Sequence, residues 1–126
     1  MNETEFLRLS DRECVKDLPS KDEFIHEFVF GYQKINLSHK VYWKKGNKSF
    51  ARYEMPYYQS WQGLGKGIEH ANENEFVINF LQYADTKDWH CHLMKGELGN
   101  LGCFDDGSIF LVFWIAYMKA LGVFDG

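Results

Sequence analysis

His90, Cys91 and His92 stand next to one another in the stretch "DWHCHLM", residues 88–94, and all three are residue types that bind transition metals. In a β-strand, neighbouring side chains point to opposite faces, so the two histidines would share one face and the cysteine would take the other. Two imidazoles on one face could bind one zinc ion, but a catalytic zinc needs three protein ligands and an open position for water.

The sequence near this pair offers no third ligand. The candidates are distant in the chain: His26, His39, His70 or a carboxylate. Because a His-x-His pair by itself lacks the context of a metal motif, the favoured interpretation is a strand with two solvent-facing imidazoles and no cofactor. A small metal-dependent enzyme that uses His90 and His92 is the alternative.

Other catalytic patterns are missing. There is no HExxH, no paired CxxC and no G-x-S-x-G, and the P-loop spacing fails because Lys66 is followed by Gly67. Asp105 and Asp106 in "FDDG" could do acid–base work only if folding brought them together in a cleft. As a local motif they indicate a turn that leads into the N-terminus of a helix. We therefore expect no catalytic residue and a protein that is not an enzyme.

Several elements would position these residues. Ser20 and Glu23 have the spacing of a capping box, which predicts a helix from about Lys21 into the low thirties. The runs "HKVYWK" and "SFARYEM" flank a Gly-Asn turn and predict a β-hairpin. A helix after Pro56 is indicated by apolar residues at helical spacing.

Two further strands follow, at residues 75–84 and 89–95, joined by the turn "DTKD". Residues 96–102 read as a loop. The apolar run 109–121 is ambiguous: its length and Gly122 as a left-handed cap favour a helix, and its composition allows a strand. Together these elements predict a single α+β domain, residues 1–126, in which two or three helices pack on an antiparallel sheet of four or more strands.

The formal net charge of −4 hides a segregated pattern. Residues 28–53 hold six bases and no acid, whereas residues 54–126 hold ten acids and four bases. A mainly acidic chain lacks the dominant basic face of a nucleic-acid binder, so nucleic acid is not the expected partner. The basic hairpin, residues 40–53, interleaves lysines with aromatics and keeps a nucleic-acid-binding module as a third interpretation.

Sequence features indicate the cellular compartment of the protein. The N-terminus has neither the basic start and apolar run of a secretory signal nor the acid-poor character of a transit peptide. The longest apolar run, residues 109–118, is shorter than the roughly 20 residues that cross a bilayer. Three cysteines without a CxxC pair argue against a disulfide framework. We expect a cytoplasmic protein with no membrane partner.

What remains is a protein-binding role. Exposed acids could steer a basic partner, and exposed aromatics make good interface anchors. The candidate partner-binding residues are Asp85, Asp88, Glu97, Asp105, Asp106, Tyr57, Tyr58 and Trp61.

The stretch "YYQSWQGLGKGIE" resembles immunity proteins of bacterial contact-dependent growth inhibition systems, some of which begin a helix with Tyr-x-x-Ser-Trp. Tyr57, Ser60 and Trp61 satisfy this spacing and Tyr58 interrupts it; the similarity covers about a tenth of the chain. The resemblance implies a small acidic cytoplasmic protein without activity of its own, which caps a toxin nuclease. We therefore expect an inhibitor that occludes the active site of a cognate toxin domain, with no binding residue carried over from the family.

Overall fold

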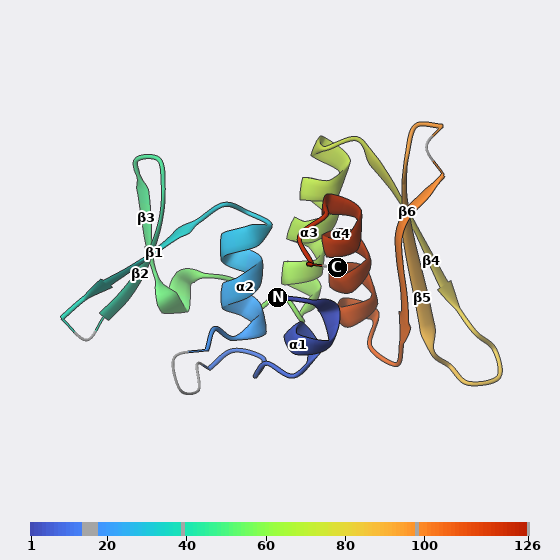
Figure 1. The fold of residues 1–126 in the computed structure, drawn as a ribbon, viewed down its shortest axis with the longest axis horizontal. Helices are drawn as coiled ribbons and strands as arrows, with labels where there is room; N and C mark the ends of the chain where they lie inside the picture. Colours follow the sequence, from blue (N-terminus) through green and yellow to red (C-terminus); the bar gives the residue numbers. More distant parts are fainter. Residues whose placement is uncertain (14–17, 39, 98, 126) are drawn as a thin grey trace. The chain divides into compact units, whose positions relative to one another are not determined.

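A computed structural model describes residues 1–13, 18–38, 40–97 and 99–125 (Figure 1). The chain divides into two compact units. The N-terminal unit is Thr4–Tyr57, and the C-terminal unit is Met1–Glu3 together with Tyr58–Gly126. Each unit is described by itself.

The N-terminal unit combines short helices with a three-stranded sheet. Its elements are α1 (Glu3–Leu7), which begins at the boundary of the units, α2 (Lys21–Phe28), β1 (Gln33–Leu37), β2 (Lys40–Lys45), β3 (Lys48–Ala51) and the 3-10 helix η1 (Arg52–Glu54). The sheet is antiparallel, in the order β1-β2-β3.

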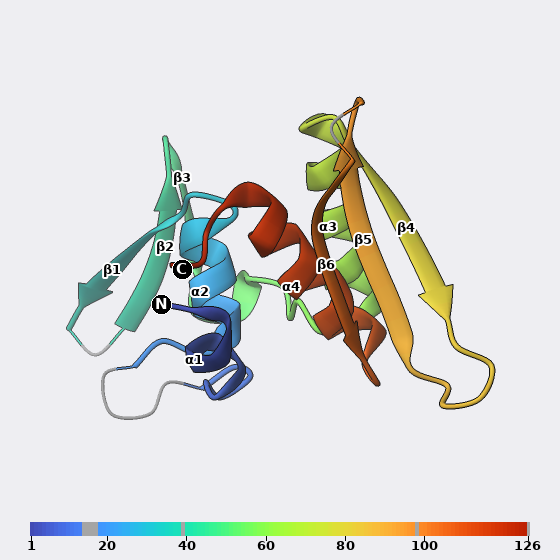
Figure 2. The ribbon, with the colours of Figure 1, turned by 45° about the vertical axis from the view of Figure 1, so that its right-hand side comes forward.

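The C-terminal unit has two long helices and a second antiparallel sheet. Its elements are α3 (Trp61–Glu73), β4 (Phe76–Gln82), β5 (Trp89–Lys95), β6 (Asn100–Asp106) and α4 (Ile109–Leu121). The strand order is β4-β5-β6. Both helices lie on one face of this sheet, and no described helix or strand of the unit lies against its other face (Figure 2).

Helix α4 is the centre of the C-terminal core. Every residue from Val112 to Met118 is buried, and the Trp114 indole donates a hydrogen bond of 2.8 Å to the Tyr58 carbonyl. Strand β6 can approach this helix because it carries Gly102 at the contact: a Cβ there would lie 2.2 Å from the Ala116 carbonyl oxygen. A close backbone approach of this kind requires glycine.

Helix α3 also packs closely on α4 because it carries a glycine at the contact. A Cβ at Gly67 would lie 2.5 Å from Phe113 Cε2 and 2.6 Å from Trp114 Cη2, whereas a Cβ at Gly65 would meet no atom within 4 Å. Two glycines two residues apart in one helix therefore differ in role, since only Gly67 faces the core.

The core of the N-terminal unit lies between α2 and the sheet. Trp43 of β2 is buried, and its ring makes an edge contact with His26 of α2 at a centroid distance of 4.9 Å. The buried acids of α2 are paired, Asp22 with Arg12 at 3.3 Å and Glu23 with Lys34 at 2.8 Å. Pairing offsets the cost of removing these carboxylates from water.

Burial governs the ionisation of His26. Removal from water lowers its pKa from 6.5 to about 4; Glu23 acts in the opposite direction and Arg12 in the same direction. The imidazole is therefore neutral in the folded protein near pH 7.

Many local expectations are confirmed. Ser20 and Glu23 form the capping box at the start of α2. The hairpin of β2 and β3 and the hairpin of β4 and β5 both form. The ambiguous run 109–121 is a helix, and it ends at Gly122 in the left-handed conformation, with φ of 73°.

Other expectations are corrected. The α+β class with antiparallel strands is confirmed. The expected architecture was one sheet with two or three helices, whereas the described residues form two three-stranded sheets and four α-helices. Helix α2 ends at Phe28, and β1 takes up the residues after Gly31, whose positive φ of 75° favours glycine and redirects the chain. The loop expected at residues 96–102 ends early, because β6 begins at Asn100.

Three further expectations need comment. In the described part of the chain, no helix has both the length and the apolar character needed to cross a membrane. Cys14 and His39 lie outside the described residues. The expectation of one globular domain stays a prediction.

We predict opposite effects for two alanine substitutions in α3. Gly67→Ala should lower the free energy of unfolding by about 2 kcal/mol, because the added methyl overlaps buried rings. Gly65→Ala, the matched control, should raise it by about 1 kcal/mol through helix propensity alone. Urea titration of both variants measures the two values. Equal effects would contradict the packing of α3 on α4.

We also predict a pH-dependent stability that His26 causes. Between pH 6.5 and pH 4 the unfolded chain takes up a proton at this imidazole and the folded chain does not, so stability falls as the pH is lowered through this window. The full contribution is about 3 kcal/mol. Urea titrations at pH 7, 5.5 and 4.5, followed by far-UV circular dichroism, should give a shallower pH dependence for His26→Gln than for the unsubstituted protein. Parallel curves would contradict burial of a neutral imidazole.

Candidate functional site

The uncovered face of the sheet β4-β5-β6 is the strongest candidate site, and we name it the open face. Alternation and strand register place its members: Val77, Asn79 and Leu81 on β4, His90, His92 and Met94 on β5, and Cys103 and Asp105 on β6. Residues of the opposite parity, such as Cys91 and Leu93, are fully buried on the helix side. His90 and His92 therefore share the open face while Cys91 points away, as the strand alternation predicts.

Four side chains of the open face and its edge form one hydrogen-bonded network. Asp105 accepts a hydrogen bond from His90 Nδ1, and His90 Nε2 lies 2.9 Å from His92 Nδ1. The Tyr83 hydroxyl donates to the other oxygen of Asp105 at 3.4 Å. The order of the network is Tyr83, Asp105, His90, His92.

The carboxylate fixes the tautomers of this network. An ionised carboxylate only accepts hydrogen bonds, so the proton of a neutral His90 must be on Nδ1, where it faces Asp105. His90 Nε2 is then an acceptor, and His92 Nδ1 must donate to it. His92 Nε2 is consequently the unprotonated nitrogen of that ring.

The acid–base properties of neighbouring groups follow from burial and charge. Burial raises the pKa of Tyr83, and the charge and hydrogen bond of Asp105 raise it further. Burial raises the pKa of the Cys91 thiol to about 12, with a smaller effect from Cys103. Because thiolates are the reactive and metal-binding form of cysteine, Cys91 is unsuited to either role near neutral pH.

The geometry of the open face is that of a relay of hydrogen bonds. Among the described residues, no three His, Cys, Asp or Glu side chains are placed so that they could hold a metal ion. The two imidazoles direct facing nitrogens at each other, 2.9 Å apart, so they do not converge on a common point. In this arrangement Asp105 and His90 orient each other and the side chains around them.

Four of the predicted acids gather at one end of this sheet. Asp85 and Asp88 lie in the connection from β4 to β5, and Asp105 and Asp106 end β6. The register pairs Trp89 with Asp106, which brings the two segments together. We name Asp85, Asp88, Asp105 and Asp106 the acidic end; Lys87 is the one base among residues 83–88.

Asp105 and Asp106 do not form a carboxylate pair. Strand alternation turns Asp105 to the open face, where it meets His90. Asp106 instead accepts a hydrogen bond of 2.9 Å from the Ser108 amide, and Ser108 caps α4 through the Leu111 amide. The turn and N-cap expected for "DDGS" are therefore present, and the two acids serve different purposes.

The remaining predicted partner-binding residues are scattered. Glu97 lies in the connection between β5 and β6, at the end opposite to Asp105. Trp61, 71% exposed, lies on α3 against Phe110, on the helix side of the sheet. Tyr57 belongs to the N-terminal unit, where Arg12 lies 4.9 Å from its ring centroid.

Tyr58 has to be corrected as a surface anchor. Only 2% of it is exposed, and its ring packs on Trp114 at a centroid distance of 5.0 Å. Tyr58 precedes α3, which begins at Trp61, and its ring fills the core beside α4. Tyr58 therefore offers no contact surface to a partner.

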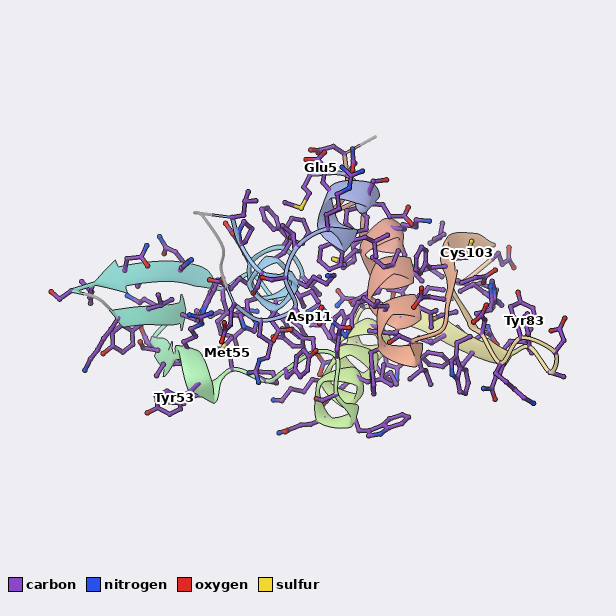
Figure 3. All side chains as sticks on the ribbon, turned by 90° about the horizontal axis from the view of Figure 1, so that it is seen from below. Glu5, Asp11, Tyr53, Met55, Tyr83 and Cys103 are labelled. Atoms are coloured by element: carbon purple, nitrogen blue, oxygen red, sulfur yellow. The ribbon has the colours of Figure 1, made fainter. Side chains whose placement is uncertain are left out.

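Sequence reasoning missed Tyr83, Cys103 and the exposed apolar residues of the open face. Val77 and Leu81 are each 55% exposed and directly neighbour Met94 and His90 across the strands. Tyr83 and Cys103 are labelled in Figure 3, where both lie on the C-terminal sheet. The alternation of β4 and β5 already indicated which of their residues share a face. Recognition of β6 as a third strand would have added Cys103 and Asp105 and so identified the whole face.

Comparison with known proteins adds no relative. No protein family model matches the chain, and neither a curated protein nor a solved structure matches it. The function must therefore be argued from the open face.

We predict that protein purified without chelator carries far less than one metal ion per chain, because the facing imidazoles already hydrogen-bond to each other. Elemental analysis of the untagged protein measures this. Stoichiometric zinc or iron that His90→Ala and His92→Ala both release would contradict the prediction and would favour the metal-dependent enzyme.

Proposed function

We propose that the protein is an inhibitor that binds a basic protein domain through the open face and its acidic end. The proposed partner is a cognate bacterial toxin domain, in particular a nuclease whose substrate groove is positively charged. The protein would act in the cytoplasm, as an immunity protein without catalytic activity. The observation that carries this proposal is the combination of exposed apolar side chains on one uncovered sheet face and carboxylates clustered at the end of the same sheet.

The apolar part of this surface supports binding. Val77 and Leu81 expose more than half of their surface, and Tyr83 stands beside them at the sheet edge. Burial of such side chains is the main favourable contribution to most protein associations. An aliphatic and aromatic centre with charged groups at its border matches the usual anatomy of an interface.

The acidic end supports the choice of a basic partner. Four carboxylates with a single neighbouring lysine produce a negative potential at this end of the sheet. Complementary charge accelerates encounter and rejects partners of the wrong sign. Carboxylates so placed could also occupy the sites at which a nuclease holds phosphates.

The histidine network supports a fixed geometry of the acids. Asp105 accepts hydrogen bonds from His90 and Tyr83, so its carboxylate is oriented before a partner arrives. Preorganisation of this kind reduces the entropy lost on binding. The network thus has a positioning role in the proposed interface and needs no catalytic one.

The test neutralises the acidic end without changing its shape. In a variant with Asp85, Asp88, Asp105 and Asp106 all replaced by Asn, we expect the association rate constant for the partner to fall at least tenfold at low salt. Immobilised protein is first used to isolate the partner from cells that make it, and surface plasmon resonance with the purified partner then measures the rates. Growth of bacteria that express the partner reports neutralisation.

The control removes charge elsewhere in the same unit. Glu69→Gln and Glu73→Gln, both on exposed positions of α3, should change the rate less than twofold. Leu81→Ser should instead increase the dissociation rate, since it removes exposed apolar surface. An unchanged association rate in the neutralised variant, or a partner that the protein does not neutralise, would overturn the proposal.

A further inference from the structure

The sheet of the N-terminal unit also has a face turned away from its helix. Strand register places Lys40, Tyr42 and Lys44 of β2 on the same face as Ser49 and Ala51 of β3. The opposite face carries the buried Trp43, which packs on α2. We name the side defined by Lys40, Tyr42 and Lys44 the basic face.

Positive charge on the basic face is not neutralised locally. Residues 28–53 contain six bases and no acid. Lys34 is paired with Glu23, and Lys45 donates a hydrogen bond of 2.6 Å to the Phe30 carbonyl. The side chains of Lys40 and Lys44 are exposed, and neither ammonium group forms a hydrogen bond or ion pair with any described residue.

A hollow borders this face. It measures about 460 Å³ and is lined by Lys40, Tyr42, Ser49, Arg52 and Tyr53, with Glu54 as its one acid. A second hollow of about 580 Å³ shares Arg52 and Tyr53 and adds Arg12 and Glu13. Tyr53 is 85% exposed and lines both hollows; Figure 3 shows its side chain standing clear of the ribbon.

We infer that the basic face and the hollows that Tyr53 lines form a binding site for single-stranded nucleic acid. The ammonium groups of Lys40 and Lys44 and the guanidinium of Arg52 would contact phosphates. The rings of Tyr53 and Tyr42 would stack on bases, and Ser49 could donate a hydrogen bond. The site is separate from the open face and does not depend on the proposed toxin partner.

Two considerations favour this ligand over other anions. Exposed aromatic rings interleaved with cations characterise single-strand binding surfaces, because every base offers a π-face and every nucleotide a charge. A duplex would use phosphate contacts but keep its bases stacked within the helix, out of reach of the tyrosine rings.

Fluorescence anisotropy with fluorescein-labelled oligonucleotides tests the inference. The probes are a 12-nucleotide oligo-dT, a 12-nucleotide oligo-rU and a 12-base-pair DNA duplex, each at 50, 100 and 200 mM salt. We expect the full chain to bind both single strands more tightly than the duplex, with affinity that falls steeply with salt.

The variants separate charge from stacking. Lys40→Gln with Lys44→Gln should weaken binding at least tenfold at 50 mM salt and reduce the slope of log K against log salt by about 1.4. Tyr53→Ala should weaken binding at least fivefold and leave that slope unchanged, and Tyr53→Phe should retain binding. The charge control, Lys66→Gln with Lys87→Gln in the C-terminal unit, should behave as the unsubstituted protein.

Several results would overturn the inference. These are no single-strand binding up to 100 µM protein at 50 mM salt, equal affinity for the duplex, or equal affinity in the Lys40/Lys44 variant. A second copy of the chain is a competing occupant, because its acidic end has the opposite charge. Sedimentation at low salt that shows a dimer lost in the Lys40/Lys44 variant, without oligonucleotide binding, would establish that occupant instead. A dimer of this kind would occupy the acidic end, whereas the oligonucleotide results do not bear on binding at the open face.

Discussion

The contact between β6 and α4 is the constraint on which the candidate site depends. Gly102 lets the strand backbone lie against the helix backbone at Ala116 and Ala120, so β6 is held as the third strand of its sheet. Only with β6 in this register does Asp105 stand opposite His90 and Cys103 opposite His92. A packing requirement on the helix side thus determines the chemistry on the open side, since every second residue of β6 faces each way.

Each unit uses a sheet with one covered face and one face left for solvent, and the charges on the two free faces differ in sign. The acidic end of the C-terminal sheet collects carboxylates from the β4–β5 connection and from the end of β6. The basic face of the N-terminal sheet draws its lysines from one hairpin. Charge on an exposed sheet also discourages unwanted pairing between strands, so the charges on both surfaces limit aggregation whatever else they bind.

The histidines that first suggested a metal centre are explained by a hydrogen-bonded network. A carboxylate at one end of a pair of imidazoles determines the tautomer of each ring and holds all three groups in a defined orientation. The same residue types could ligate a metal only if their donor atoms converged, and here they point at one another. Orientation of Asp105 for recognition is the role that agrees with both the geometry and its exposure at the edge of an apolar surface.

The sequence by itself determined the elements whose signals are local. Ser20 with Glu23 predicted the start of α2, the Gly-Asn turn predicted the β2-β3 hairpin, and Gly122 predicted the end of α4, because caps and tight turns depend on a few adjacent residues. The alternation of β5 likewise placed His90 and His92 on one face. Strand β6, with Gly102 in its interior and two aspartates at its end, carried no such signal. The residues before β1 were expected to continue a helix, so β1 was not predicted.

Tertiary structure alone decided the rest. Tyr58 and Trp61 lie three residues apart, yet the first is buried against Trp114 and the second stays exposed beside Phe110, because burial depends on how much of each ring the fold covers. The network of Tyr83, Asp105, His90 and His92 joins three segments through cross-strand register, which no local pattern specifies. Local sequence thus determined where the strands and helices form, and packing between them determined which side chains meet.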